Sequence, residues 1–184
     1  MKIAKEQVAS LNQVWIEDHQ DQFRFVQDRL EKKGVPVEAV LQKIQDFQVA
    51  IPSWALGAGG TRFGRFSYGG EPGNLEEKIK DVGIIHALTQ SAGAISLHIP
   101  WDIPEDPTAI KELASMHGLL FDAVNSNTFQ DQADQSHSYK YGSLCHTDPM
   151  AREQAIQHNK EVIDLGAALG LSLIHISEPT RPRL

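Results

Sequence analysis

The chain has 184 residues, with 24 Asp and Glu against 17 Lys and Arg, a formal net charge of −7 and 41% hydrophobic residues. This balance excludes a disordered chain, and the acidic charge argues against nucleic acid as a partner. The one cysteine, Cys145, argues against a disulfide scaffold and for a reducing, cytoplasmic setting, while the lack of a long apolar run or a signal-peptide segment argues against a membrane partner.

Five helices are expected from the spacing of apolar residues and from the residues that begin and end helices. Asn74, with Glu77 three residues later, has the form of a capping box. Asp106 and Asp148 are each followed by a proline, which is the pattern of an N-cap and a first helical turn. The expected helices cover 19–34, 35–47, 75–88, 107–118 and 149–170.

Three short apolar runs between these helices have the length and composition of strands, and they cover 48–54, 94–102 and 119–127. Strands that alternate with helices predict an α/β fold with a parallel sheet, and their nearly continuous apolar character predicts burial on both faces. Polar and aromatic residues gather at their carboxyl ends, where parallel α/β proteins place their sites: Ser53, Trp54, His98, Trp101, Asp102, Asn125, Ser126 and Asn127. The last three could hydrogen-bond a turn or contact a polyol.

The glycine-rich run GAGGTRFGRF (57–66) invites a test for phosphate binding. It lacks the Gly-Lys-Ser/Thr of a P-loop, and Arg62 stands where a dinucleotide-binding motif needs glycine. The run therefore indicates either a flexible surface loop or, through Phe63 and Phe66, a lid or subunit contact.

The run SLHIPWD (96–102) places His98, Trp101 and Asp102 at the end of an expected strand. Imidazole can transfer protons near neutral pH, a carboxylate can orient it, and tryptophan can stack on a small ligand. A core histidine with a satisfied hydrogen bond is the alternative. No histidine pair has the H-E-x-x-H arrangement and Cys145 has no second cysteine, so the sequence predicts no metal site within this chain.

Four runs in the same order, IPSWALGAGGTRFGRF, SLHIPWD, NSNTFQD and YKYGSLCHTDPMAREQAIQH, resemble the bacterial L-rhamnose isomerase/sugar isomerase family of xylose-isomerase-like TIM barrels. The resemblance extends to about Gly170 and is to the type with a broad sugar range. It implies an N-terminal helical segment over 1–47, then about three of the eight units of a (β/α)8 barrel over 48–170.

The resemblance implies an aldose–ketose isomerase that opens the sugar ring and moves hydrogen between C1 and C2 with divalent metal ions, usually Mn²⁺. Trp54, Trp101 and Phe129 would line the sugar pocket with His98, which would act in ring opening. Phe63 would reach into the site of a neighbouring subunit of a homotetramer. The spacing alone, and not the resemblance, suggests Asp102 as the partner of His98.

The family takes its metal ligands from later strands, so we expect this chain to be a fragment without isomerase activity. The run LSLIHISEPTR (171–181) resembles the one-frame translation of a transposon-type sequencing adapter, and residues 171–184 are therefore expected to be non-native. LSLIHI also has the pattern of a strand that could pair as a fourth. A small α/β module that binds a sugar or nucleotide without catalysis is the alternative function.

Overall fold

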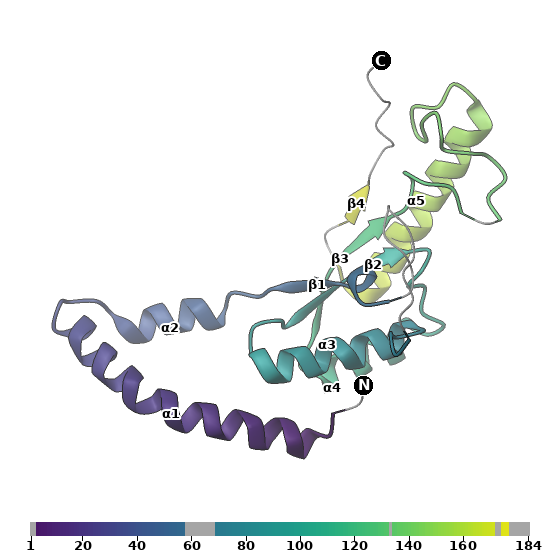
Figure 1. Cartoon of the computed structure of the whole chain (residues 1–184). Helices are drawn as coiled ribbons and strands as arrows, with labels where there is room; N and C mark the ends of the chain where they lie inside the picture. Colours follow the sequence, from purple (N-terminus) through teal and green to yellow (C-terminus); the bar gives the residue numbers. More distant parts are fainter. Residues whose placement is uncertain (1–2, 58–68, 133, 172–173, 177–184) are drawn as a thin grey trace.

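A computed structural model describes residues 3–57, 69–132, 134–171 and 174–176. It contains four short strands that alternate with helices after two N-terminal helices (Figure 1). The elements are α1 (Lys5–Glu31), α2 (Val37–Gln45), β1 (Ala50–Pro52), the 3-10 turn η1 (Ser53–Ala55), α3 (Leu75–Thr89), β2 (Ala94–Ile99), α4 (Pro107–Met116), β3 (Leu120–Ser126), α5 (Pro149–Leu169) and β4 (Ile174–Ile176).

The strands form one open sheet in the order β1-β2-β3-β4, and every neighbouring pair is parallel. The prediction of an α/β fold with a parallel sheet is therefore confirmed. β4 lies in the run that resembles an adapter translation, and it pairs with β3 in a register that sets His175 beside Asn125. The strand expected in LSLIHI is therefore present over Ile174–Ile176.

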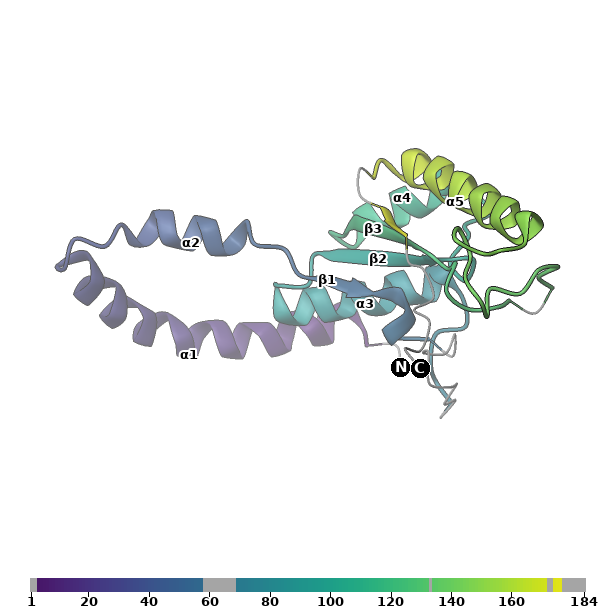
Figure 2. The ribbon, with the colours of Figure 1, turned by 90° about the horizontal axis from the view of Figure 1, so that it is seen from above.

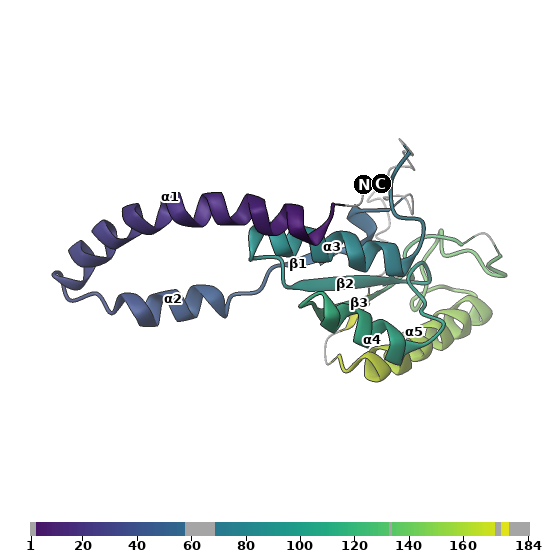
Figure 3. The same ribbon diagram turned by 90° about the horizontal axis from the view of Figure 1, so that it is seen from below.

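The helices α3, α4 and α5 form a row on one face of the sheet, with α4 packed against both of the others (Figure 3). The core between this row and the sheet is aliphatic and consists of Leu75, Ile79, Val82, Ile95, Leu97, Ile110, Ala114, Leu119 and Leu169. Because successive side chains of a strand point to opposite faces, the residues between these core positions lie on the other face. They form polar pairs there, since Ser96 donates to the Asp122 carboxylate at 3.1 Å. The prediction of burial on both faces is confirmed for β2, where only Ser96 is partly exposed, and holds for β3 only toward its carboxyl end.

Side-chain caps begin three of the helices as the sequence predicts. The Asp106 carboxylate accepts from the N–H groups of Thr108 and Ala109, and the Asp148 carboxylate accepts from that of Met150. Asn74 accepts from the Glu77 N–H at 2.9 Å. Such caps stabilise a helix by about 1 kcal/mol each.

Two details of the predicted helices differ in the structure. Glu77 reaches back to the N–H of Gly73 at 2.7 Å, one residue before the expected one, so the capping box is displaced. The first helix begins at Lys5 and not at residue 19. No side chain of residue 4 caps it, because that residue is Ala4, and so its start lacks the signal that marked the others.

The helices α1 and α2 form a hairpin that extends away from the sheet (Figures 1 and 2). The near end of α1 packs on α3, where Asn12 donates to the carbonyl of Ala87 at 2.8 Å. Beyond that contact the hairpin keeps large apolar side chains exposed, including Val14, Trp15, Ile16, Phe23, Phe25, Val26, Val40, Ile44 and Phe47. Packing against the core of this chain therefore does not explain the apolar residues of the N-terminal segment.

Candidate functional site

The structure brings together four of the residues singled out in the sequence. The His98 ring, at the end of β2, lies 4.3 Å from the Trp101 ring, 5.5 Å from the Trp54 ring and 5.7 Å from the Phe129 ring, measured between centroids. Trp54 comes from η1, which directly follows β1, and Phe129 from the loop after β3. Three carboxyl strand ends thus contribute to one aromatic cage around an imidazole. Phe63, the fifth predicted residue, lies outside the described residues.

The His98 ring is neutral in this cage. Its side chain is 2% exposed, and burial lowers the pKa of His98 from 6.5 to about 4. The nearby Asp102 carboxylate acts in the opposite direction, while Lys78 and His158 lower the pKa further. An uncharged imidazole keeps one nitrogen as a donor and the other as an acceptor.

Asp102 does not orient the His98 ring, so that prediction is wrong. Its carboxylate accepts from the backbone N–H of His98 at 2.8 Å and from the hydroxyl of Ser53. The other oxygen accepts from the Lys78 ammonium at 2.6 Å. Because the carboxylate lies against the backbone between η1 and β2, it fixes the strand ends that carry Trp54 and His98.

Lys78 and Gly57 are part of this support, and no motif in the sequence gives either of them this role. Lys78 belongs to α3, and its ammonium is buried against Asp102. A Cβ added to Gly57 would lie 2.8 Å from the Lys78 side chain, so glycine there leaves room for the lysine stem. The apolar face of α3, on which Lys78 lies beside Ile79 and Val82, was the signal that could have shown a buried lysine.

Asn125 is the residue that contacts the His98 ring. Its side-chain Nδ2 lies 2.8 Å from Nδ1 of His98, across the paired strands β3 and β2. From the sequence alone, Asn125 could either hydrogen-bond a turn or contact a polyol. In the structure it lies within the strand and partners the imidazole.

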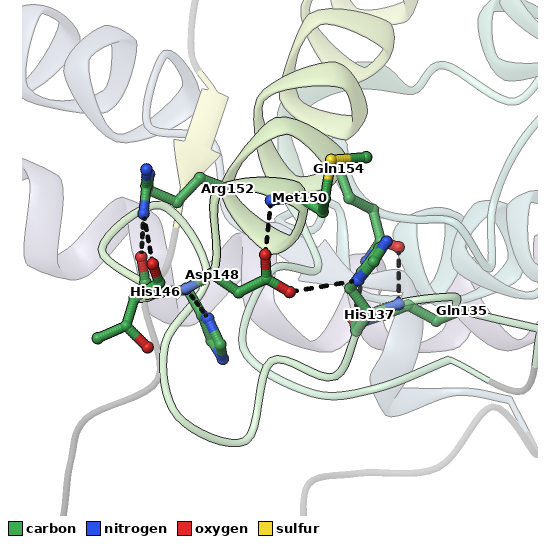
Figure 4. A network of polar contacts seen from close by, with 8 residues as sticks. Gln135, His137, His146, Asp148, Met150, Arg152 and Gln154 are labelled. Carbon is green, nitrogen blue, oxygen red and sulfur yellow. Dashed lines mark hydrogen bonds and ion pairs between the residues drawn. The ribbon is translucent and has the colours of Figure 1, made fainter.

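The loop between β3 and α5, which carries Phe129, is fixed to the first turns of α5 (Figure 4). The Gln154 side chain binds both backbone groups of His137. It accepts from the N–H at 3.0 Å and donates to the carbonyl at 2.9 Å. Arg152 donates to the carbonyl of His146 at 2.6 Å. The aromatic cage is thus attached to an anchored loop.

A cavity of about 550 Å³ lies between this loop and α5, and polar side chains such as Asn127, Gln132 and His158 line it. Gln132 also accepts from the Trp101 indole N–H at 3.3 Å, so the cavity adjoins the cage. A groove of about 670 Å³ lies between α1 and α3. His98 lines neither of these two spaces.

The described residues contain no group of three or more His, Cys, Asp or Glu side chains that could hold a metal ion. They also contain no helix long and apolar enough to cross a membrane. The residues that carry the site are thus an imidazole, three aromatic rings, an amide and a buried ion pair.

No family model matches the chain. Two curated relatives are both described as probable sugar isomerases. One, from Rhizobium meliloti (strain 1021), is 52% identical over 143 residues, which are 78% of this chain and 33% of that protein. The other, from Mesorhizobium japonicum, is 46% identical over 168 residues, which are 91% of this chain and 39% of that protein. The chain is therefore homologous to probable sugar isomerases and spans between a third and two fifths of their length.

Proposed function

We propose that the chain supplies one wall of the sugar site of an aldose–ketose isomerase of the L-rhamnose/L-rhamnulose type, with a broad range of sugars. The observation that carries the proposal is the aromatic cage of Trp54, Trp101 and Phe129 around a neutral His98. Homology to probable sugar isomerases supports the same class of substrate. The cytoplasmic location and the homotetramer expected from the sequence belong to this proposal.

The cage suits a pyranose because each sugar has C–H faces and hydroxyl edges. Aromatic rings pack against the C–H faces, and the imidazole offers a polar atom to the oxygens at C1 or in the ring. Ring opening breaks the bond between C1 and the ring oxygen, while the C1 hydroxyl loses a proton and the ring oxygen gains one. His98 would act at this exchange. Mn²⁺ would supply Lewis-acid chemistry for the later hydrogen shift, but the described residues do not fit such an ion, so no step here depends on it.

Sugar binding tests the proposal on the 184-residue chain. We expect L-rhamnose to change the tryptophan emission, because Trp54 and Trp101 belong to the cage that would contact the sugar. Trp101→Ala should weaken this binding by about tenfold or more, since stacking on an aromatic ring contributes on the order of 1 kcal/mol or more. Trp15→Ala, on the exposed face of α1, is the matched control and should leave the affinity unchanged. A chain that gives no sugar-dependent signal would contradict the proposal.

Isomerase activity of the 184-residue chain is a separate prediction. With Mn²⁺ and L-rhamnose, we expect the 184-residue chain to form no detectable ketose, because the described residues offer no group that could hold the ion. Product analysis by chromatography measures this directly. Ketose formation above the level of a His98→Gln variant would show that the wall proposed here is itself a complete catalyst.

A further inference from the structure

Asn125 and His98 are paired positions of neighbouring strands, β3 and β2. Their side chains meet on the sheet face opposite the helices, with Nδ2 of Asn125 2.8 Å from Nδ1 of His98. The other ring nitrogen, Nε2, is buried and has no hydrogen-bond partner among the described residues. The two ring nitrogens of His98 thus differ: Nδ1 has a polar partner in Asn125, and Nε2 has none among the described residues.

The chemistry of the amide decides which nitrogen carries the proton. An amide NH2 group can only donate, so the ring nitrogen that it contacts must present its lone pair. A neutral imidazole has one lone-pair nitrogen and one N–H, and therefore the proton is on Nε2. A buried donor without a partner is costly, which gives a ligand oxygen at that position a favourable contact.

We propose that Asn125 is a positioning residue that holds His98 in its Nε2–H form, so that His98 offers a hydrogen-bond donor to a sugar oxygen at the aromatic cage. The inference rests on the proposed function for the identity of that oxygen. His98 would donate a hydrogen bond to the ring oxygen as the C1–oxygen bond breaks and would keep its own proton, while the ring oxygen takes up the proton that the C1 hydroxyl loses. A neutral imidazole acts elsewhere as an electrophile in this way.

The charged groups around His98 agree with this assignment. The Asp102 carboxylate contacts His98 through the backbone N–H and not through the ring. The Lys78 ammonium lies 2.6 Å from this carboxylate and neutralises its charge. His158 is the third titratable neighbour, and burial lowers its pKa as well. No described carboxylate therefore accepts from Nδ1, which is the contact that would favour the opposite tautomer and the charged ring.

The test is ¹⁵N NMR of the histidine-labelled 184-residue chain, with the His98 signals identified by their loss in His98→Gln. We expect a protonated Nε2 and a lone pair on Nδ1. Asn125→Asp is nearly isosteric but can only accept once ionised, and it should move the proton to Nδ1 and weaken L-rhamnose binding by about tenfold or more. Asp122→Asn, which lies on the same strand and contacts Ser96, is the matched control and should change neither.

The outcomes separate this inference from the proposed function. A wild-type spectrum with the proton on Nδ1 overturns the inference without any variant, so the test does not depend on the folding of Asn125→Asp. Sugar binding that is unchanged in Asn125→Asp also overturns it, while the proposed function stands. A wild-type chain that has the proton on Nε2 but binds no L-rhamnose overturns both the proposed function and the donor role of His98. Only the assignment of the His98 tautomer would then stand.

Discussion

Replacing Lys78 by methionine is expected to lower the free energy of unfolding by about 3–5 kcal/mol, because it leaves the buried Asp102 carboxylate without its counter-charge. The ammonium and carboxylate lie 2.6 Å apart, with the side chains 6% and 0% exposed. Methionine keeps most of the apolar stem of the lysine and removes only the charge. Urea unfolding followed by circular dichroism measures the loss.

Lys80 supplies a matched control on the same helix. It pairs with Glu76 at 3.6 Å on the exposed surface, and Lys80→Met should cost no more than about 1 kcal/mol. In the double variant Lys78→Met with Asp102→Asn, the loss should be smaller than the sum of the two single losses, because the unpaired charge is gone. Equal losses for Lys78→Met and Lys80→Met would contradict the buried pair as a support of the site.

Folding stability should fall as the pH drops below about 6.5, and His98 should be a main cause. Burial lowers the pKa of the folded-state His98 to about 4, whereas the unfolded chain takes up the proton near 6.5. Between these values the unfolded state binds one more proton, so stability declines with falling pH by about 1.4 kcal/mol per unit. Above pH 6.5 both states are neutral and the contribution is constant.

The measurement is the free energy of unfolding in urea at several pH values between 7.5 and 4.5, compared between the wild type and His98→Asn. The free energy of unfolding should change less steeply with pH in the variant than in the wild type, whatever the difference between their stabilities at neutral pH. His19→Asn, at an exposed position of α1, is the control and should keep the wild-type slope. His158 is buried in the same region and should contribute in the same direction, so some slope remains in His98→Asn. Parallel curves of unfolding free energy against pH for the wild type and His98→Asn would contradict the prediction, because they would show that His98 has the same pKa in the folded and the unfolded state.

Local signals account for what the sequence predicts well in this fold. Asp106 and Asp148 begin their helices because a carboxylate beside the first N–H groups acts within a few residues. The alternation of strands and helices is equally local, and the parallel sheet follows from it. α1 was predicted too short because Ala4 gives its start no capping side chain.

The sequence indicates the site residues that lie within one short run. It does not indicate contacts between side chains from distant elements. His98 and Trp101 share the run SLHIPWD, Trp54 follows the first expected strand, and the family resemblance added Phe129. A spacing of four residues could not show that the Asp102 carboxylate turns to the backbone instead of the ring. The contacts of Asp102 with Lys78, and of His98 with Asn125, depend on how α3 and β3 are placed beside β2, which no single run encodes.

The hairpin of α1 and α2 has a consequence for the dynamics of the chain. Its tie to the body is at the near end, through Asn12 and the packing of α1 on α3, while the far end leaves large apolar side chains such as Phe25 and Val26 exposed to water. Segments with few buried contacts open without the rest of the protein. Amide hydrogens at the far end of the hairpin should therefore exchange with solvent through local opening, whereas those of β2 exchange only when the sheet itself unfolds.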